Sequence, residues 1–268
     1  GESRPNIRFS EGNGWKKYQY SSLADVAVGS ALDLSGEVEA PAGRLGRLTV
    51  SPKGELVFAR KPGTPVRLLG FNGGLDFLMD EKEPERFREN ARRFAQQARR
   101  QGYRLFRVHP MLDRICEGGE EGRVSPELLD RWDYLIAELK KEGIYLHLVI
   151  FSFRLYGKEI QTFADWNYHK LMMYLDGEWE FERFRYAVDT LFAHVNPYTG
   201  IAWKDEPAIA FVEYYNEQSL GIVESRVREV FRKHPRIRVV SIDEGFKGNA
   251  SFFKYARDLG NRRGDMYE

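Results

Sequence analysis

The stretch Ala208-Ile209-Ala210-Phe211-Val212-Glu213-Tyr214-Tyr215-Asn216-Glu217 is largely apolar and ends in an amide and a carboxylic acid. A near-continuous apolar run of this kind is typical of a parallel strand that is covered on both faces. In α/β proteins, residues that carry chemistry gather at the carboxyl ends of such strands. The stretch therefore predicts a buried strand with Asn216 and Glu217 at its functional end.

On the N-terminal side of this strand, similar apolar runs alternate with amphipathic helical patterns. Pro84 and Ser125 suit helix starts, and Gly102 and Gly143 suit helix stops. The patterns predict strands at 66–72, 105–109 and 144–151, and helices at about 84–101, 125–143 and 180–194. Strands that alternate with helices through short connections predict βαβ units and a parallel sheet, so the fold class is α/β.

The two ends of the chain give weaker patterns. Residues 1–44 are irregular and rich in Gly, Ser and Pro, which indicates an N-terminal segment or linker remnant before a barrel domain of residues 45–268. This domain opens with a short β-hairpin at 45–60, and its barrel portion covers 66–268. We also expect a loop at 194–200 and a fifth strand at 236–243.

The composition argues against several classes of function. A net charge of +1, from 41 Lys and Arg against 40 Asp and Glu, gives no basic field for nucleic acid. No apolar run approaches the roughly 18 residues of a membrane span, and Gly1-Glu2-Ser3-Arg4 is too polar for a signal peptide. The lone Cys116 excludes an internal disulfide, and no clustered ligands suggest a metal site. We therefore expect no nucleic-acid or membrane partner, no cofactor and no metal.

Polar side chains stand at the tips of several predicted strands. Asn72 ends the first strand, Arg107 and His109 end the second, and Asn216 with Glu217 ends the fourth. If the sheet closes into an eight-stranded barrel, these tips face one mouth and share a pocket. An arginine there can orient a carboxylate and lower its pKa, whereas a carboxyl kept neutral by burial can act as an acid near neutral pH.

Arg107-Val108-His109 followed about a hundred residues later by Asn216-Glu217 resembles the family 5-like glycoside hydrolases of clan A. Further stretches look like a large bacterial group of such enzymes, namely Ala40 to Gly46, Leu69 to Asn72, Ile136 to Tyr145 and His194 to Gly200. The likeness covers roughly residues 32 to 220 and, more faintly, the last helix.

This resemblance implies a (β/α)₈ TIM-type barrel that hydrolyses a β-linked polysaccharide or oligosaccharide with retention, in an extracellular or periplasmic setting. Glu217 would protonate the leaving oxygen and then activate water, and Asn216 would bond the sugar 2-hydroxyl. Arg107 would hold the nucleophilic carboxylate, and His109 would line the subsite of the reacting sugar. Asn72 and Trp166 complete the expected substrate contacts, since the ring of Trp166, in the long loop after the third strand, suits the apolar face of a pyranose.

The sequence departs from the family pattern in one respect: the expected nucleophilic carboxylate is missing. The family places its nucleophilic Glu on the seventh strand, whereas the pattern here ends near the fourth or fifth, so an incomplete barrel of strands 1 to 4 or 5 is expected. Glu213 cannot substitute, because four residues along a strand put it roughly 13 Å from Glu217, and a retaining pair needs about 5–5.5 Å. Asp243 or Glu244 is a remaining candidate. A truncated product, a fragment whose C-terminal half lies elsewhere, and a second copy that completes the barrel stay open as explanations.

Each candidate also has a structural interpretation. Glu217 could pair with a neighbouring arginine, and His109 could cap a strand end. Arg107 could form an ion pair with Glu213, and His147 is interpreted as a satisfied core histidine. The alternative functions are a non-catalytic carbohydrate-binding protein or inactive half-barrel, and a metal-dependent barrel hydrolase that uses His109 and His147.

Overall fold

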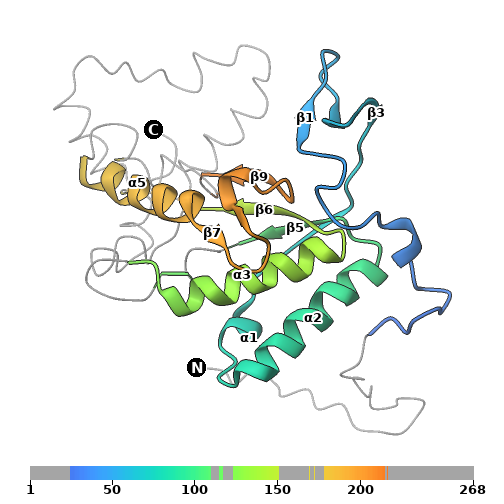
Figure 1. Ribbon diagram of the computed structural model, residues 1–268, viewed down its shortest axis with the longest axis horizontal. Coiled ribbons are helices and arrows are strands. Elements are labelled where there is room, and N and C mark those ends of the chain that lie inside the picture. The colour runs from blue at the N-terminus through green and yellow to red at the C-terminus, as the bar shows by residue number, and fades with distance from the viewer. Residues whose placement is uncertain are drawn as a thin grey trace, which may run out of the picture.

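The computed structural model describes residues 25–109, 115–116, 123–150, 169, 172, 178–214 and 216. Figure 1 shows a central sheet flanked by long helices, with a smaller sheet beside it. The described elements are η1 Ser35–Glu37, β1 Leu48–Val50, β2 Leu56–Phe58, β3 Lys61–Pro65, β4 Gly70–Gly73, α1 Asp76–Met79, α2 Pro84–Arg100, β5 Leu105–Val108, α3 Pro126–Lys141, β6 Tyr145–Val149, α5 Glu178–Ala193, β7 Val195–Asn196, β8 Ile201–Ala202, η4 Trp203–Asp205 and β9 Ile209–Glu213.

The central sheet is parallel, and its order β4-β5-β6-β9 follows the order of the chain. Asn72 is level with Arg107, and Arg107 is level with His147, so these residues form a row across three strands. Neighbouring parallel strands joined through helices confirm the α/β class. Closure into an eight-stranded barrel, complete or incomplete, stays a prediction.

The strand predicted at 66–72 begins later than the sequence suggests. β4 starts at Gly70, because the Val66 N–H donates to the Leu56 carbonyl oxygen at 2.7 Å and so belongs to the smaller sheet. Val66 and Leu68 pack beside Phe58. The apolar run is therefore divided between two sheets.

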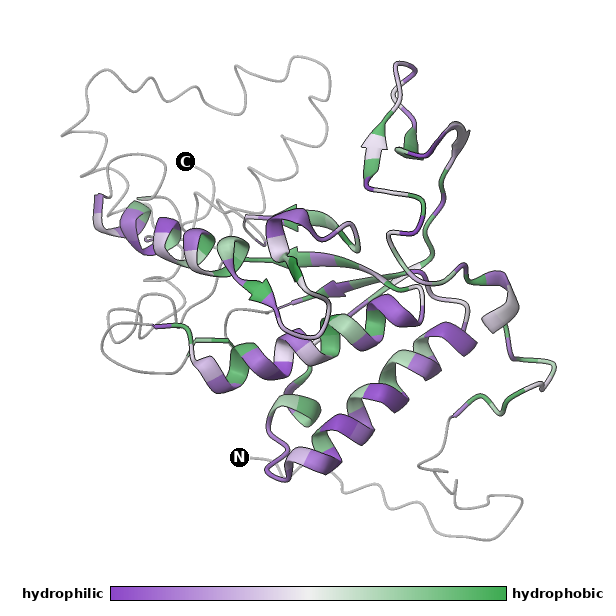
Figure 2. Cartoon of the chain, viewed as in Figure 1, coloured by the Kyte–Doolittle hydropathy of each residue, from purple (hydrophilic) through white to green (hydrophobic). Residues whose placement is uncertain are grey.

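The helices are close to their predicted bounds, for local reasons that are visible in the structure. Pro84 occupies the first turn of α2, and the Ser125 hydroxyl accepts a hydrogen bond from the Leu128 N–H at 3.3 Å at the start of α3. The two helices pack side by side (Figure 1), and the outward face of α2 is strongly hydrophilic (Figure 2). None of the described helices has the length and apolar character of a membrane span.

The two faces of the central sheet differ in chemistry. Phe106 and Val108 of β5 and Leu146 and Leu148 of β6 are buried and belong to the main core with residues of α2, α3 and α5. Alternate residues of a strand point to opposite faces, so Arg107 and His147 lie on the other side. That second face carries the polar row.

The amino ends of the strands are covered by the smaller sheet, which is antiparallel with the order β1-β2-β3. Phe58 of β2 stacks on Tyr145 of β6, with ring centroids 5.2 Å apart. The sequence did not predict β3, because Pro62 and Pro65 argue against a strand. β3 is an edge strand, where proline is tolerated.

Residues 25–44, here called the N-terminal strap, are irregular apart from η1 and pack against the domain. Val38 is buried in the main core, and the Ala42 N–H donates to the Lys140 carbonyl oxygen at 2.8 Å. Gly143 has a φ of +85°, and a Cβ at that position would lie 2.5 Å from the Glu39 carbonyl oxygen. The strap therefore lies directly on the turn that ends α3.

The segment predicted as a loop at 194–200 is partly a hairpin. β7 pairs antiparallel with β8, with Val195 level with Ala202. The expectation of a plain loop was wrong because these strands are two residues long, too short for a periodic pattern.

Candidate functional site

The polar row at the carboxyl end of the central sheet is organised by Arg107. Its Nε donates to Glu213 Oε2 at 2.9 Å and its Nη2 to Glu213 Oε1 at 2.8 Å, which is a two-point ion pair between β5 and β9. Nη1 donates to Asn72 Oδ1 and Nη2 to Asn216 Oδ1, each at 2.9 Å. A guanidinium has five N–H groups, and four of them have acceptors among the described residues.

His147, inside β6, is the fifth residue of this cluster. Its Nε2 lies 3.0 Å from Glu213 Oε2, and its ring lies against Phe211 with centroids 5.5 Å apart. Burial lowers the pKa of His147; the Glu213 charge opposes this effect and the Arg107 charge adds to it, so the pKa lies below its usual value. The imidazole is therefore neutral at pH 7, and Nε2 carries the proton that Glu213 accepts.

Glu213 is an anion in this setting. Burial raises the pKa of Glu213, but hydrogen bonds and charge from Arg107 outweigh it, with smaller help from His147 and His109. The net pKa lies below its usual value. Because a general acid must hold its proton near the working pH, Glu213 is unsuited to that role. Its charge instead balances that of Arg107.

Three of the predicted site residues are thus brought together, because the guanidinium of Arg107 donates to both Asn72 and Asn216. His109 follows β5 and lies near enough to Glu213 to lower its pKa, and its backbone N–H donates to the Gly73 carbonyl oxygen at 3.5 Å. Glu217 and Trp166 lie outside the described residues. The structural alternative for Arg107, an ion pair with Glu213, is present.

Two members of the cluster were not among the predicted site residues. Glu213 was considered as an ion-pair partner and rejected as the nucleophile, and His147 was interpreted as a core histidine or, in the metal-dependent alternative, as a ligand. Both side chains are about a quarter exposed, at 25% and 23%, so they lie on the sheet face beside the tips and not in the main core. The available signal was alternation, because Glu213 lies two residues after Phe211 on the same face of β9.

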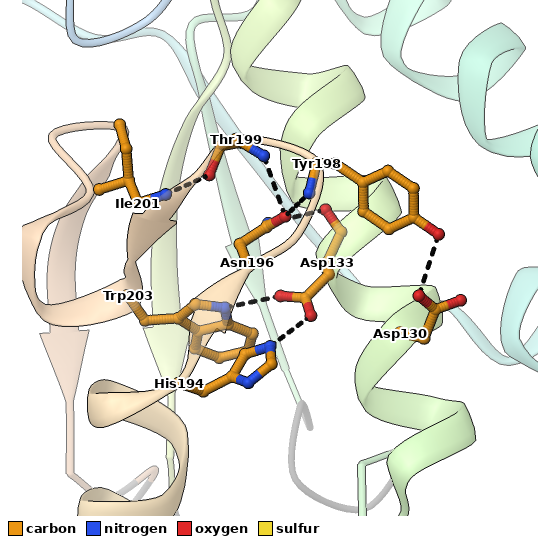
Figure 3. Close-up of polar contacts among 8 residues, drawn as sticks. All are labelled: Asp130, Asp133, His194, Asn196, Tyr198, Thr199, Ile201 and Trp203. Carbon is orange, nitrogen blue, oxygen red and sulfur yellow. Dashed lines mark hydrogen bonds and ion pairs between the residues drawn. The ribbon is translucent and has the colours of Figure 1, made fainter.

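A second polar cluster joins α3 to the hairpin that follows α5 (Figure 3). Asp133, 1% exposed, accepts from Trp203 Nε1 at 2.8 Å and lies 2.5 Å from His194 Nε2. Asn196 Nδ2 donates to the Asp133 carbonyl oxygen at 2.9 Å, and its Oδ1 accepts from the backbone of the turn at Tyr198 and Thr199. Burial raises the pKa of Asp133, against the effect of His194 and Trp203. This cluster satisfies buried polar groups between elements, which indicates a structural role.

Within the part of the chain that the structure describes, no three His, Cys, Asp or Glu side chains come together as a metal site.

No model of a known protein family matches this chain. A segment of 42 residues is 50% identical to glyceraldehyde-3-phosphate dehydrogenase of Pyrobaculum calidifontis, and it makes up 16% of this chain and 12% of that protein.

Among solved structures, the chain is similar to a glycoside hydrolase family 5 mannosidase from Rhizomucor miehei, with a TM-score of 0.47 and 14% identity over 73% of this chain and 55% of that one. It is similar to an endo-β-1,4-mannanase from Thermotoga petrophila, with a TM-score of 0.43 and 21% identity over 65% of this chain and 40% of that one. An endo-1,4-β-mannanase from Rhizomucor miehei gives a TM-score of 0.44 and 13% identity over 75% of this chain and 62% of that one. The chain thus spans 40% to 62% of the length of these proteins.

Proposed function

We propose that this chain carries part of the active site of a retaining glycoside hydrolase that acts on a β-linked polysaccharide or oligosaccharide. Glu217 is its general acid/base, and Asn216 binds the hydroxyl next to the reacting carbon. Arg107, Asn72 and His109 line the same site, and Trp166 offers a stacking surface for a sugar ring.

The observation that carries this proposal is the convergence of strand tips on Arg107. Asn72 lies in β4 and Asn216 lies three residues after the end of β9, and both side-chain oxygens accept from one guanidinium. The sequence resemblance, which rests on the same Arg107 and Asn216-Glu217, supports the same roles.

The chemistry of Glu213 also supports Glu217 as the acid. Glu213 has a lowered pKa and is held by Arg107 and His147, so another carboxyl must supply the proton to the leaving oxygen. The nucleophile has no candidate among the described residues of this site. A second carboxylate about 5–5.5 Å from the acid/base completes the retaining mechanism in the proposal.

The decisive experiment compares the wild-type sequence with Glu217→Gln on a panel of β-linked oligosaccharides, each in a protein that also supplies the second carboxylate. We expect release of reducing ends to fall about 10²–10⁴-fold, because protonation of a sugar leaving group is lost. On an aryl glycoside with an activated leaving group, the variant should give a burst followed by a slow phase that azide accelerates. Asp205→Asn is the matched control, since Asp205 is an exposed acid before the other end of β9.

Unchanged turnover in Glu217→Gln contradicts the acid/base role. The second candidate function, a non-catalytic carbohydrate-binding protein, is favoured by the pairing of Glu213 with Arg107, which leaves that carboxylate unavailable for catalysis. Wild-type protein that binds an oligosaccharide in calorimetry without hydrolysing it supports this candidate, and absence of both binding and hydrolysis contradicts both.

A further inference from the structure

Glu213 connects residues from three strands of the sheet. Its two oxygens receive hydrogen bonds from Arg107 on β5, and Oε2 also contacts His147 on β6. Arg107 uses its remaining contacts to hold Asn72 and Asn216. Among the described contacts, Glu213 reaches both asparagines through the guanidinium of Arg107.

We propose that Glu213 is the positioning residue of this site: it fixes the plane of the Arg107 guanidinium, and Arg107 thereby fixes the side chains of Asn72 and Asn216. This inference rests on the proposed function for its catalytic consequence. The geometric part stands on the described contacts alone.

The two-point ion pair is what makes orientation possible. A carboxylate that accepts from both Nε and Nη2 lies in the guanidinium plane and prevents its rotation. Nη1 and the second hydrogen of Nη2 then point in fixed directions, toward Asn72 and Asn216 respectively. A neutral amide in place of the carboxylate would present one donor to the donors of Arg107 and break one of the two bonds.

His147, on the strand between β5 and β9, also bonds the carboxylate. Its Nε2 donates to Glu213 Oε2, the oxygen that also receives the Arg107 Nε–H bond. This third contact limits rotation of the carboxylate about its own bond. Replacement of His147 by Phe removes the donor, whereas replacement by Gln keeps a side-chain N–H that can donate.

The experiment compares Glu213→Gln with Glu206→Gln as a matched control. Glu206 is also a paired glutamate, bonded to Lys140 at 2.9 Å and 2% exposed, but it precedes β9 at the other end of the sheet. Steady-state kinetics on a β-linked oligosaccharide and the NMR signal of the Arg107 Nε–H are measured for both variants and for the wild-type chain.

We expect Glu213→Gln to lower kcat about 10²-fold with a smaller change in KM, because misplacement of catalytic groups by about 1 Å costs that much. Without the Glu213 carboxylate, the charge of Arg107 is unpaired and lowers the pKa of the proposed acid, Glu217. The alkaline limb of the pH profile of kcat therefore moves to lower pH. The Arg107 Nε–H signal, slow to exchange in the wild type and in Glu206→Gln, is lost. A kcat within twofold of the wild type, or the same losses in Glu206→Gln, overturns the proposal.

If Glu213→Gln does not fold, His147→Phe and His147→Gln provide the test. We expect His147→Phe to lower kcat several-fold and His147→Gln to restore it, and equal activity of both contradicts the inference. If the wild-type chain, with the second carboxylate supplied, hydrolyses no β-glycan, the proposed function fails. The Arg107 signal then decides the positioning inference separately: its loss in Glu213→Gln alone supports it, and its persistence overturns it.

Discussion

Among single residues, Arg107 supplies the hydrogen-bond donors that connect the strands at the site. Among the described residues, four of its five N–H groups bond Glu213, Asn72 and Asn216. The ion pair with Glu213 uses the Nε and Nη2 edge of the guanidinium, which is one of its two-point edges.

His147 predicts a specific dependence of stability on pH. Its folded pKa is lowered by burial and by Arg107, against Glu213, so in the window below about 6.5 the unfolded chain binds more protons than the folded one. This contribution to the free energy of unfolding is present above about pH 6.5 and is lost as the pH falls through the folded pKa. Urea unfolding between pH 5 and 7 measures it.

His147→Gln keeps a donor for Glu213 but does not titrate, so we expect the variant to lose less stability than the wild type over this range. Equal slopes for the two proteins show that His147 is not responsible.

At this scale the sequence identified the residues and raised the Arg107–Glu213 ion pair as one interpretation, but not the bonds from Arg107 to Asn72 and Asn216. Arg107 and Asn216 stand out as polar groups at strand ends, whereas the pair between Arg107 and Glu213 joins positions 106 residues apart. The Ala208 to Glu217 run looks uniformly apolar up to Glu213, and only the alternation of faces in the folded strand separates Glu213 from the core.

Among elements, the Asp133 cluster connects α3 to η4 and to the β7–β8 hairpin (Figure 3). Asp133→Ala leaves the Trp203 N–H and the His194 ring without their acceptor, and we expect a loss of about 3 kcal/mol in the free energy of unfolding. Asp133→Asn should cost about 1 kcal/mol, because an amide oxygen can face Trp203 while His194 changes tautomer to accept from the amide.

Chemical denaturation measures these losses, and ¹⁵N NMR of the histidine detects the tautomer change. Asp130→Ala is the matched control one turn earlier on α3, where the exposed carboxylate bonds the Tyr198 hydroxyl at 2.9 Å. A loss there as large as in Asp133→Ala contradicts the assignment of a special role to Asp133.

The sequence predicted long elements better than short ones. α2 begins at a proline, α3 begins at a Ser125 cap, and the apolar stripes of both extend over several turns, so their bounds were predictable. β3, β7 and β8 form because of neighbours that are distant in the chain or because a turn brings short segments together. Such pairing has no periodic signature.

Over the whole molecule, the N-terminal strap contributes a side chain to the main core. Val38 is 2% exposed in the main core, while Leu32 of the same segment is 72% exposed. We expect Val38→Ala to lower the free energy of unfolding by about 2 kcal/mol and Leu32→Ala to change it by less than about 0.5 kcal/mol. Thermal or urea unfolding of the two variants tests whether the strap is part of the cooperative unit, and equal effects contradict it.

The contact between Gly143 and the strap restricts the order in which the two can change during evolution. Any side chain at that position meets the Glu39 carbonyl oxygen, so the residue permitted after α3 is dictated by a segment about a hundred positions earlier. Without the strap, the steric obstacle disappears and only the cost of a positive φ remains, which Asn tolerates better than most residues. In a lineage that sheds the strap, the glycine can change only after the loss, so the two events have a fixed order.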